Sequence, residues 1–187
     1  MKWHANLWLL ATALCAAGIA NAQSAAGYPR QPIRLVVPYS PGTGIDILAR
    51  SVGQELTKQW GQPVVVENKV GASGNIGTAA AAHAAPDGYT LLMNVNSHVI
   101  NKSVFRDPQY DPIRDFAPIT LAAWGRLLLV VHPSTKIESR KDFIRTAKDR
   151  PGKPNFASPG IGTPHHIAME LFKLQTGTEL FHVSYKG

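Results

Sequence analysis

Cysteine is almost absent from this sequence: Cys15 is the one cysteine among 187 residues. That count excludes a disulfide scaffold, a cysteine-rich zinc site and an iron–sulfur protein. Charged residues make up only 17% of the chain and hydrophobic residues 44%, which excludes an intrinsically disordered chain. No apolar run reaches the ~18 residues that a membrane-spanning helix needs.

Neither the basic nor the acidic residues are concentrated in one segment of the chain. Lys and Arg number 19 against 12 Asp and Glu, which gives a net charge of +7, and the basic residues are dispersed along the chain. A nucleic-acid-binding protein would show its Lys and Arg clustered on one face or one segment. The balance therefore favours a soluble protein with an anionic ligand, and no nucleic-acid partner is expected.

The usual metal and hydrolase motifs are also missing. His165 and His166 are adjacent, so on a helix they point about 100° apart and cannot share one metal ion, and no H-x-x-x-H pattern supports them. Ser40, Ser97 and Ser158 are expected in loops, and none lies in a G-x-S-x-G motif. We expect no metal, although a catalytic triad assembled from distant residues stays open.

A glycine-rich segment at 71–77 resembles the G-x-x-G-x-x-G loop of short-chain dehydrogenases, which holds a dinucleotide pyrophosphate. Four residues separate it from the preceding strand, and no Tyr-x-x-x-Lys pair occurs in the chain. No cofactor is therefore expected. A dehydrogenase and a secreted hydrolase remain the enzymatic alternatives.

The first 22 residues have the pattern of a secretory signal peptide. Lys2 supplies a positive start, 7–19 is an apolar run too short to span a bilayer, and Ala20-Asn21-Ala22 is an A-x-A cleavage site. An uncleaved N-terminal anchor is the alternative. Cleavage removes Cys15, which suits an oxidising compartment, and the bacterial style of the signal predicts a periplasmic protein.

Strands and helices alternate along the rest of the chain, which predicts an α/β protein with largely parallel sheets and helices on both faces. The irregular, proline-containing stretch near 111–124 is the expected domain junction, so we expect a first lobe over 23–120 and a second over 121–187. Strands are expected at 33–37, 64–66, 89–93, 127–131, 155–158 and 181–185, of which 64–66 should be buried. Helices are expected at 45–60, 77–85, 140–147 and 164–174, with Gly61 ending the first and Ser139 capping the third.

The last expected strand is followed almost at once by Gly187, with no helix to cover it. A parallel sheet left open there would expose apolar surface. We therefore expect both lobes to be incomplete, with a C-terminal part missing.

Two loops lead from a strand into a helix and are rich in glycine, at 38–46 and 158–166. Glycine lets backbone N–H groups approach a ligand closely, and a helix start presents unpaired N–H groups to an anion. Thr163 is a good N-cap and Pro164 suits the first helical position. Each loop can hold a carboxylate, or can simply be a tight turn before a capped helix.

A series of short motifs in one order resembles the substrate-binding receptors of tripartite tricarboxylate transporters, also called the Bordetella uptake gene family. The resemblance covers residues 28–187. Its motifs are Tyr28-Pro29-x-x-Pro32-Ile33, Pro38-Tyr39-x-Pro41-Gly42 with Asp46, Val66-Glu67-Asn68-Lys69 with Gly71-Ala72-x-Gly74-x-Ile76-Gly77, Pro86-Asp87-Gly88-Tyr89-Thr90-Leu91-Leu92, Asp115-Phe116-x-Pro118-Ile119 and Gly160-x-Gly162-Thr163-x-x-His166.

The resemblance implies a type II periplasmic-binding-protein fold, with a ligand held between two lobes. It implies a non-enzymatic receptor that captures a small organic carboxylate and passes it to the membrane subunits of the transporter; a non-functional fragment of such a receptor is a further alternative. Thr43 and Ile45 depart from the family's usual first loop, so ligand specificity does not carry over. The implied ligand-binding residues are Tyr39, Ser40, Gly42, Thr43, Asp46, Ser97, Gly160, Gly162, Thr163 and His166.

Overall fold

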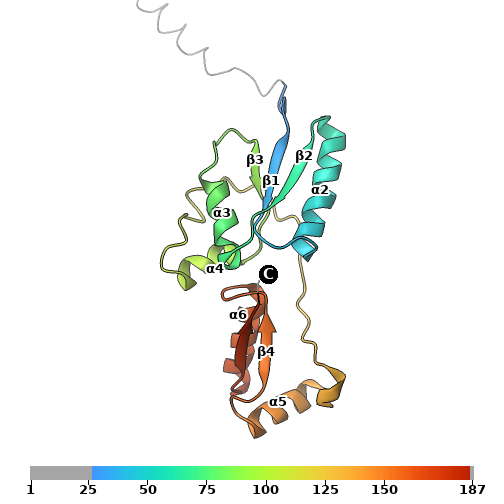
Figure 1. Cartoon of the computed structure of the whole chain (residues 1–187), viewed down its shortest axis with the longest axis vertical. Helices are drawn as coiled ribbons and strands as arrows, with labels where there is room; N and C mark the ends of the chain where they lie inside the picture. Colours follow the sequence, from blue (N-terminus) through green and yellow to red (C-terminus); the bar gives the residue numbers. More distant parts are fainter. Residues whose placement is uncertain (1–26, 186–187) are drawn as a thin grey trace, which may run out of the picture. The chain divides into compact units, whose positions relative to one another are not determined.

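The computed structural model describes residues 27–185, so the expected signal peptide at 1–22 lies outside the described residues. Residues from Gln31 onward form one compact unit. The described part of that unit builds two separate sheets, one of three strands and one of two, and every strand pairing in them is parallel (Figure 1). The lobe boundary at 120 and 121 stays a prediction.

The first sheet has the strand order β2-β1-β3, built from β1 (Ile33–Val37), β2 (Val64–Asn68) and β3 (Thr90–Leu92). The helix α2 (Gly44–Trp60) joins β1 to β2, and α3 (Asn75–Ala82) joins β2 to β3. Right-handed crossovers to opposite sides of β1 place these helices on opposite faces of the sheet (Figure 1). In such open sheets ligands bind at the carboxyl ends of the strands, where the strand order reverses.

The central strand β1 forms the core of the first sheet, since Ile33, Val36 and Val37 have no exposed surface. The prediction that residues 64–66 form a buried strand is half right. They lie in β2, but β2 is an edge strand and the side chain of Val65 is 55% exposed. An apolar run alone does not distinguish a central strand from an edge strand.

One helix was not predicted, and it places Ser97 differently from the expected loop. Ser97 is the first residue of α4 (Ser97–Val104). The residues of α4 that point inward are polar, Ser97 and Asn101, whereas Val99 and Val104 are exposed. This helix therefore has no apolar inward face, and hydrophobic periodicity could not reveal it.

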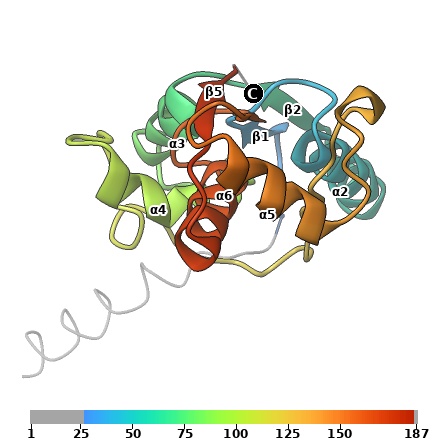
Figure 2. The same ribbon diagram turned by 90° about the horizontal axis from the view of Figure 1, so that it is seen from below.

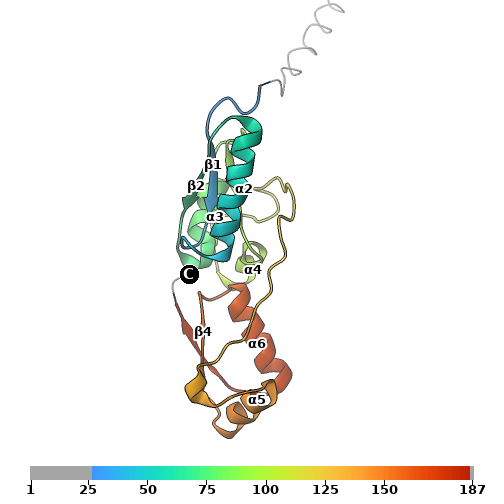
Figure 3. The ribbon, with the colours of Figure 1, turned by 90° about the vertical axis from the view of Figure 1, so that its right-hand side faces the viewer.

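The second sheet pairs β4 (Asn155–Ser158) with β5 (Phe181–Ser184). The helices α5 (Arg140–Asp149) and α6 (Pro164–Thr176) are both seen in Figure 2. They meet where the rings of Phe143 and Phe172 lie 5.6 Å apart between centroids, and α6 runs along β4 (Figure 3). The core beside this sheet contains Phe143, Ala147, Phe156 and Leu180, and Phe172 of α6 packs against it. The residues of β4 alternate in burial, so one face of this sheet is covered and the other is exposed.

Local signals for the helix ends are confirmed. Ser139 caps α5 by accepting the Asp142 N–H at 3.1 Å, and Thr163 caps α6. Gly61 ends α2 with a left-handed φ of 67°. The alanine-rich helix α3 ends at Ala82 rather than near residue 85.

The expected strand at 127–131 is wrong. In the described part of the chain these residues form neither strand nor helix, and their side chains are exposed, Leu128 by 84%. A run of apolar residues becomes a strand only when a neighbouring strand takes up its backbone N–H and C=O groups. No described strand pairs with this segment.

Candidate functional site

The loop between β1 and α2 is closed by hydrogen bonds within itself. The Gly42 N–H donates to Asp46 Oδ2 at 2.8 Å, and the Thr43 hydroxyl donates to the Ser40 carbonyl at 2.8 Å. Gly42 has a φ of 82°, a conformation that favours glycine. This geometry turns the chain sharply from β1 into the first turn of α2.

Asp46 holds this loop in place. Its side chain is 2% exposed, and its carboxylate also accepts from Asn68 Nδ2 at 2.9 Å and Arg50 Nε at 3.0 Å. The Arg50 guanidinium, the Gly42 N–H and the Asn68 amide together lower the pKa of Asp46 to about 2. With its oxygens engaged in this way, Asp46 is a positioning residue for the loop.

The start of α2 presents backbone donors at the carboxyl end of β1. The first helical hydrogen bond of α2 is donated by Ile47, to the Thr43 carbonyl at 3.0 Å. The N–H groups of Gly44 and Ile45 precede it and point out of the helix end. Because the helix dipole adds partial positive charge there, this end favours an anion.

Tyr39 and Ser97, both predicted to bind ligand, are buried, Tyr39 in the loop after β1 and Ser97 at the start of α4. The Tyr39 hydroxyl is hydrogen bonded to Ser97 Oγ and to Asn94 Oδ1, the latter at 3.0 Å. Burial raises the pKa of Tyr39, and Ser97 has no exposed surface. The two hydroxyls therefore tie the loop after β1 to the start of α4.

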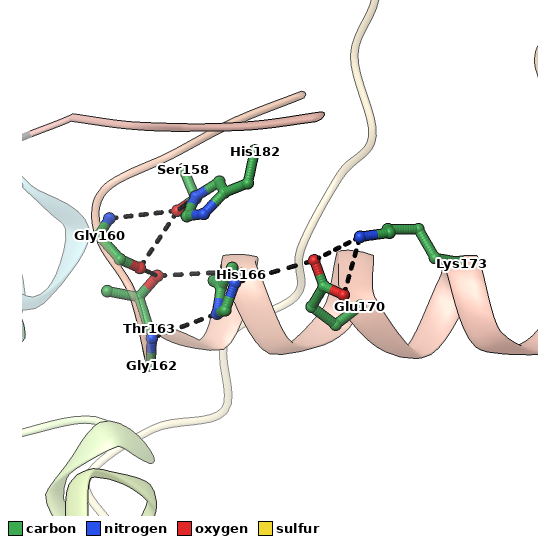
Figure 4. A network of polar contacts seen from close by, with 8 residues as sticks. All are labelled: Ser158, Gly160, Gly162, Thr163, His166, Glu170, Lys173 and His182. Atoms are coloured by element: carbon green, nitrogen blue, oxygen red, sulfur yellow. Dashed lines mark hydrogen bonds and ion pairs between the residues drawn. The ribbon is translucent and has the colours of Figure 1, made fainter. Parts of the chain in front are cut away.

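The loop between β4 and α6, drawn in Figure 4, has the same pattern of hydrogen bonds as the first loop. The Gly162 N–H donates to His166 Nδ1 at 3.3 Å, and the Thr163 hydroxyl donates to the Gly160 carbonyl at 2.7 Å. Gly162 has a φ of 80°, and the His166 N–H donates to Thr163 Oγ1 at 3.4 Å. Here the acceptor of the glycine N–H is the imidazole of His166, whereas in the first loop it is the carboxylate of Asp46.

A second histidine lies against the first. The rings of His166 and His182 are 4.3 Å apart between centroids, and His182 Nε2 lies 2.7 Å from Ser158 Oγ. Glu170 lies 3.8 Å from His166 Nε2 and accepts two hydrogen bonds from Lys173 (Figure 4). Burial and the neighbouring His166 lower the pKa of His182, partly offset by Glu170.

Glycine at 162 is required by space as well as by backbone conformation. A Cβ at Gly162 would lie 2.8 Å from Asn101 Oδ1. Asn101 is 1% exposed, its amide donates to the Ser73 carbonyl at 3.0 Å, and its Oδ1 has no hydrogen-bond partner among the described residues. Gly77, in the segment that resembles a dinucleotide loop, is likewise packed, since a Cβ there would lie 2.5 Å from the Lys69 carbonyl.

The sequence analysis missed three residues that shape these loops. Asn68 ends β2 beside the end of β1, where parallel strands bring their carboxyl ends together, and it already stood in one of the family motifs. His182 faces α6 because it pairs with the inward-facing Phe156. Glu170 lies one helical turn beyond His166. The helix predicted at 164–174 is the signal that could have placed these two side chains next to each other.

Neither of two open hollows described on residues 27–185 is lined by these loops. One hollow of about 420 Å³ lies along the end of α6, lined by residues such as Lys173 and Thr178, and another of about 280 Å³ lies beside Arg34 and Val66. Within residues 27–185 no three metal-binding side chains gather, and no helix is long and apolar enough to cross a membrane.

Solved structures with this fold are periplasmic binding proteins. One described as a periplasmic transporter is 40% identical with a TM-score of 0.77, and the R. palustris protein Rpa4515 with adipate is 36% identical with a TM-score of 0.80. MatC from Rhodopseudomonas palustris with bound malate is 28% identical with a TM-score of 0.79. This chain is covered to 86% in each case, and those chains to 54 or 55%.

Sequence comparison identifies the family within this class. The model of the tripartite tricarboxylate transporter family receptor matches residues 48–187. Protein BugT of Bordetella pertussis is 39% identical over 176 residues, which is 93% of this chain and 54% of BugT. A protein encoded between tcbD and tcbE in Pseudomonas sp. strain P51 is 37% identical over 89% of this chain and 50% of its own length.

The chain belongs to the tripartite tricarboxylate transporter receptor family, as its motifs predicted, and it has the α/β fold of periplasmic binding proteins. It spans about half the length of the curated relatives that it matches.

Proposed function

We propose that this protein is a periplasmic receptor that binds a small organic carboxylate and delivers it to the membrane subunits of a tripartite tricarboxylate transporter. One observation carries the proposal: two glycine–threonine loops of the same geometry each lead into a helix start, one at the end of β1 and one at the end of β4. Helix starts of this kind bind carboxylates through backbone N–H groups.

The predicted site residues divide into two roles in this proposal. Backbone groups of the loops contact the ligand, whereas buried side chains hold the loops in shape. The contact group comprises Ser40, Gly42, Thr43, Gly160, Gly162 and Thr163; the positioning group comprises Tyr39, Asp46, Ser97 and His166.

Two family relationships support a carboxylate ligand. The adipate and malate in the structures of Rpa4515 and MatC are both dicarboxylates, and these proteins share the fold and 36% and 28% of the aligned sequence with this chain. An acid with two carboxylates can place one at each of two helix starts. We therefore expect a dicarboxylate or tricarboxylate to bind more tightly than a monocarboxylate.

Thermal unfolding with adipate, malate and citrate tests the proposal. A ligand at 100 times its dissociation constant adds about 2.7 kcal/mol to the free energy of unfolding. Gly162→Ala should abolish the ligand-induced shift, because its Cβ would meet Asn101. Gly152→Ala is the matched control, since Gly152 also has a positive φ, 70°, but open space around its Cβ position. A receptor role is wrong if no acid raises the melting temperature of the unsubstituted chain.

A hydrolase is the second candidate, and the pair of Ser158 and His182 is the observation that favours it, with 2.7 Å between Oγ and Nε2. Ser158 is only 4% exposed, and its hydroxyl also accepts the Gly160 N–H at 3.2 Å, so it is poorly placed to attack a substrate. Hydrolysis of a p-nitrophenyl ester that disappears in Ser158→Ala would favour the hydrolase; stoichiometric binding without turnover favours the receptor.

Periplasmic location is tested separately. Cleavage after Ala22 should give a mature chain that begins at Gln23 in the periplasmic fraction. N-terminal sequencing of that fraction measures it. A chain that keeps residues 1–22 in the cytoplasm would contradict both export and a receptor role.

A further inference from the structure

The hydrogen bond between Gly162 and His166 depends on the protonation state of an imidazole. The Gly162 N–H donates to Nδ1 at 3.3 Å, so Nδ1 must be unprotonated for this bond to exist. Protonation of Nδ1 turns it from an acceptor into a donor. It therefore releases the Gly162 N–H and adds a positive charge beside the loop.

The two neighbouring imidazoles, His166 and His182, are not expected to be protonated together. His182 on β5 lies 4.3 Å away between ring centroids, and a charge on both rings would be repulsive. On α6, Glu170 lies 3.8 Å from His166 Nε2, and Lys173 is paired with Glu170 at 2.9 Å. The strand β4 contributes the uncharged Phe156 and Ser158. Burial, His166 and Lys173 lower the pKa of His182, and Glu170 partly offsets them.

From this geometry we infer that the loop at 160–166 binds its anion together with a proton on His166, so that carboxylate affinity rises as the pH falls. The inference rests on the proposed function, because it assigns the regulation of the proposed carboxylate site. A bound carboxylate takes the Gly162 N–H that His166 gives up and is stabilised by the new imidazolium. By linkage, proton and anion then increase each other's affinity equally.

The first loop provides a comparison within the same molecule. There the Gly42 N–H is accepted by Asp46, whose pKa of about 2 keeps it ionised throughout the neutral range. Histidine changes its charge between about pH 5 and pH 8. Only the second of the two loops is therefore expected to respond to pH in that range.

The release of the Gly162 amide is tested without any ligand. Nuclear magnetic resonance of the 15N-labelled chain between pH 8 and pH 5 should show the Gly162 amide following the protonation of the His166 ring, and the Gly42 amide unaffected. In His166→Asn, where the Asn carbonyl can accept the N–H without titrating, the Gly162 amide should no longer follow pH. If the amide signal of Gly162 did not change with protonation of His166, the inference would be wrong.

Calorimetric binding of adipate at pH 8 and pH 6 tests the linkage. The affinity of the unsubstituted chain should be about fivefold or more higher at pH 6, and binding in buffers of different ionisation enthalpy should reveal proton uptake. His166→Asn and His166→Asp, the latter a copy of the first loop, should lose this difference; any change that comes from adipate itself persists in both. His182→Phe should keep it, since the acceptor of the Gly162 N–H remains.

The outcomes separate the inference from the proposed function. Binding of adipate that is equally tight at both pH values leaves the receptor role standing and contradicts the inference, as does a pH effect that persists unchanged in His166→Asn. Failure of adipate, malate and citrate to bind at either pH contradicts the receptor role. In that case the ligand-free titration still decides whether His166 controls the Gly162 amide.

Discussion

The loops after β1 and β4 have the same backbone and opposite side-chain chemistry. In each, a glycine with φ near 80° precedes an N-cap threonine with φ near −70°, at Gly42-Thr43 and at Gly162-Thr163. Each threonine hydroxyl donates to a carbonyl three residues earlier, and each glycine N–H donates to a side chain four residues later. That side chain is an acid in the first loop and a base in the second.

The next helical turn reverses the charges as well. Asp46 is paired with Arg50, and His166 faces Glu170, in both cases four residues further on. The first loop is thus fixed by a carboxylate that stays ionised, and the second by an imidazole, which accepts the Gly162 N–H only while Nδ1 carries no proton. The comparison shows that the backbone geometry of a helix-start loop does not require one particular acceptor.

Alanine at the two glycines should have the largest and most unequal effect. Gly42→Ala is expected to cost about 1–2 kcal/mol for its left-handed backbone. Gly162→Ala is expected to cost about 2–4 kcal/mol, because it also forces a Cβ against Asn101. Urea unfolding measures both. Equal costs would mean that the contact with Asn101 does not constrain Gly162.

Removing the charge of Asp46 tests the fixed loop. Asp46→Asn should lower the melting temperature by roughly 3–6 °C at pH 7, because Arg50 and the Gly42 N–H lose a carboxylate partner. The folded pKa of about 2 lies below that of an unfolded aspartate, so this stabilisation is present above about pH 4 and is lost as the pH falls towards 2. The melting temperatures of variant and parent should therefore converge in acid. A constant difference would contradict the ionic origin.

The threonine hydroxyls should matter less. Thr43→Val removes one hydrogen bond to the Ser40 carbonyl and is expected to cost about 1 kcal/mol. Thr163→Val should cost slightly more, by up to ~1 kcal/mol, because Thr163 Oγ1 also accepts the His166 N–H. Chemical unfolding of the two variants side by side measures the difference; a larger loss at Thr43 would reverse this order.

The pH dependence of stability should show the smallest effect. The pKa of His182 is lowered in the fold, so its neutral form is favoured by folding. Its contribution is present above the unfolded pKa of about 6.5 and is lost as the pH falls through the folded value. We therefore expect the free energy of unfolding to fall as the pH is lowered through the range in which histidine titrates, and this fall should be smaller in His182→Phe. An unchanged slope in that variant would place the titration elsewhere.

Local signals predicted much of this fold, and signals that depend on partners did not. Ser139, Thr163 and Gly61 marked helix ends correctly because caps act on neighbouring residues. The helix at 97–104 was missed because its inward side chains are polar, and the strand at 127–131 was wrong because strand formation needs a neighbour. Partners that are distant in the sequence cannot be identified from local patterns.

The candidate site, too, could be predicted only in part from the sequence. The glycines and threonines of both loops stood out through their spacing, and the structure places each pair at a helix start. Which acceptor each glycine N–H would meet did not follow from spacing, although both acceptors were named as site residues. The partners Asn68 and His182 lie 22 and 16 residues from Asp46 and His166, and come close only through strand pairing.

The exposed apolar segment at 127–131 has a consequence for how the protein behaves in concentrated solution. Five successive branched aliphatic residues without proline or charge have the composition of aggregation-prone strands, and here their backbone groups are not paired with a described strand. Such a segment can pair with its copy in another molecule. Self-association that grows with protein concentration, and that a lysine at Leu128 suppresses, is therefore a property to expect of this chain during purification and storage.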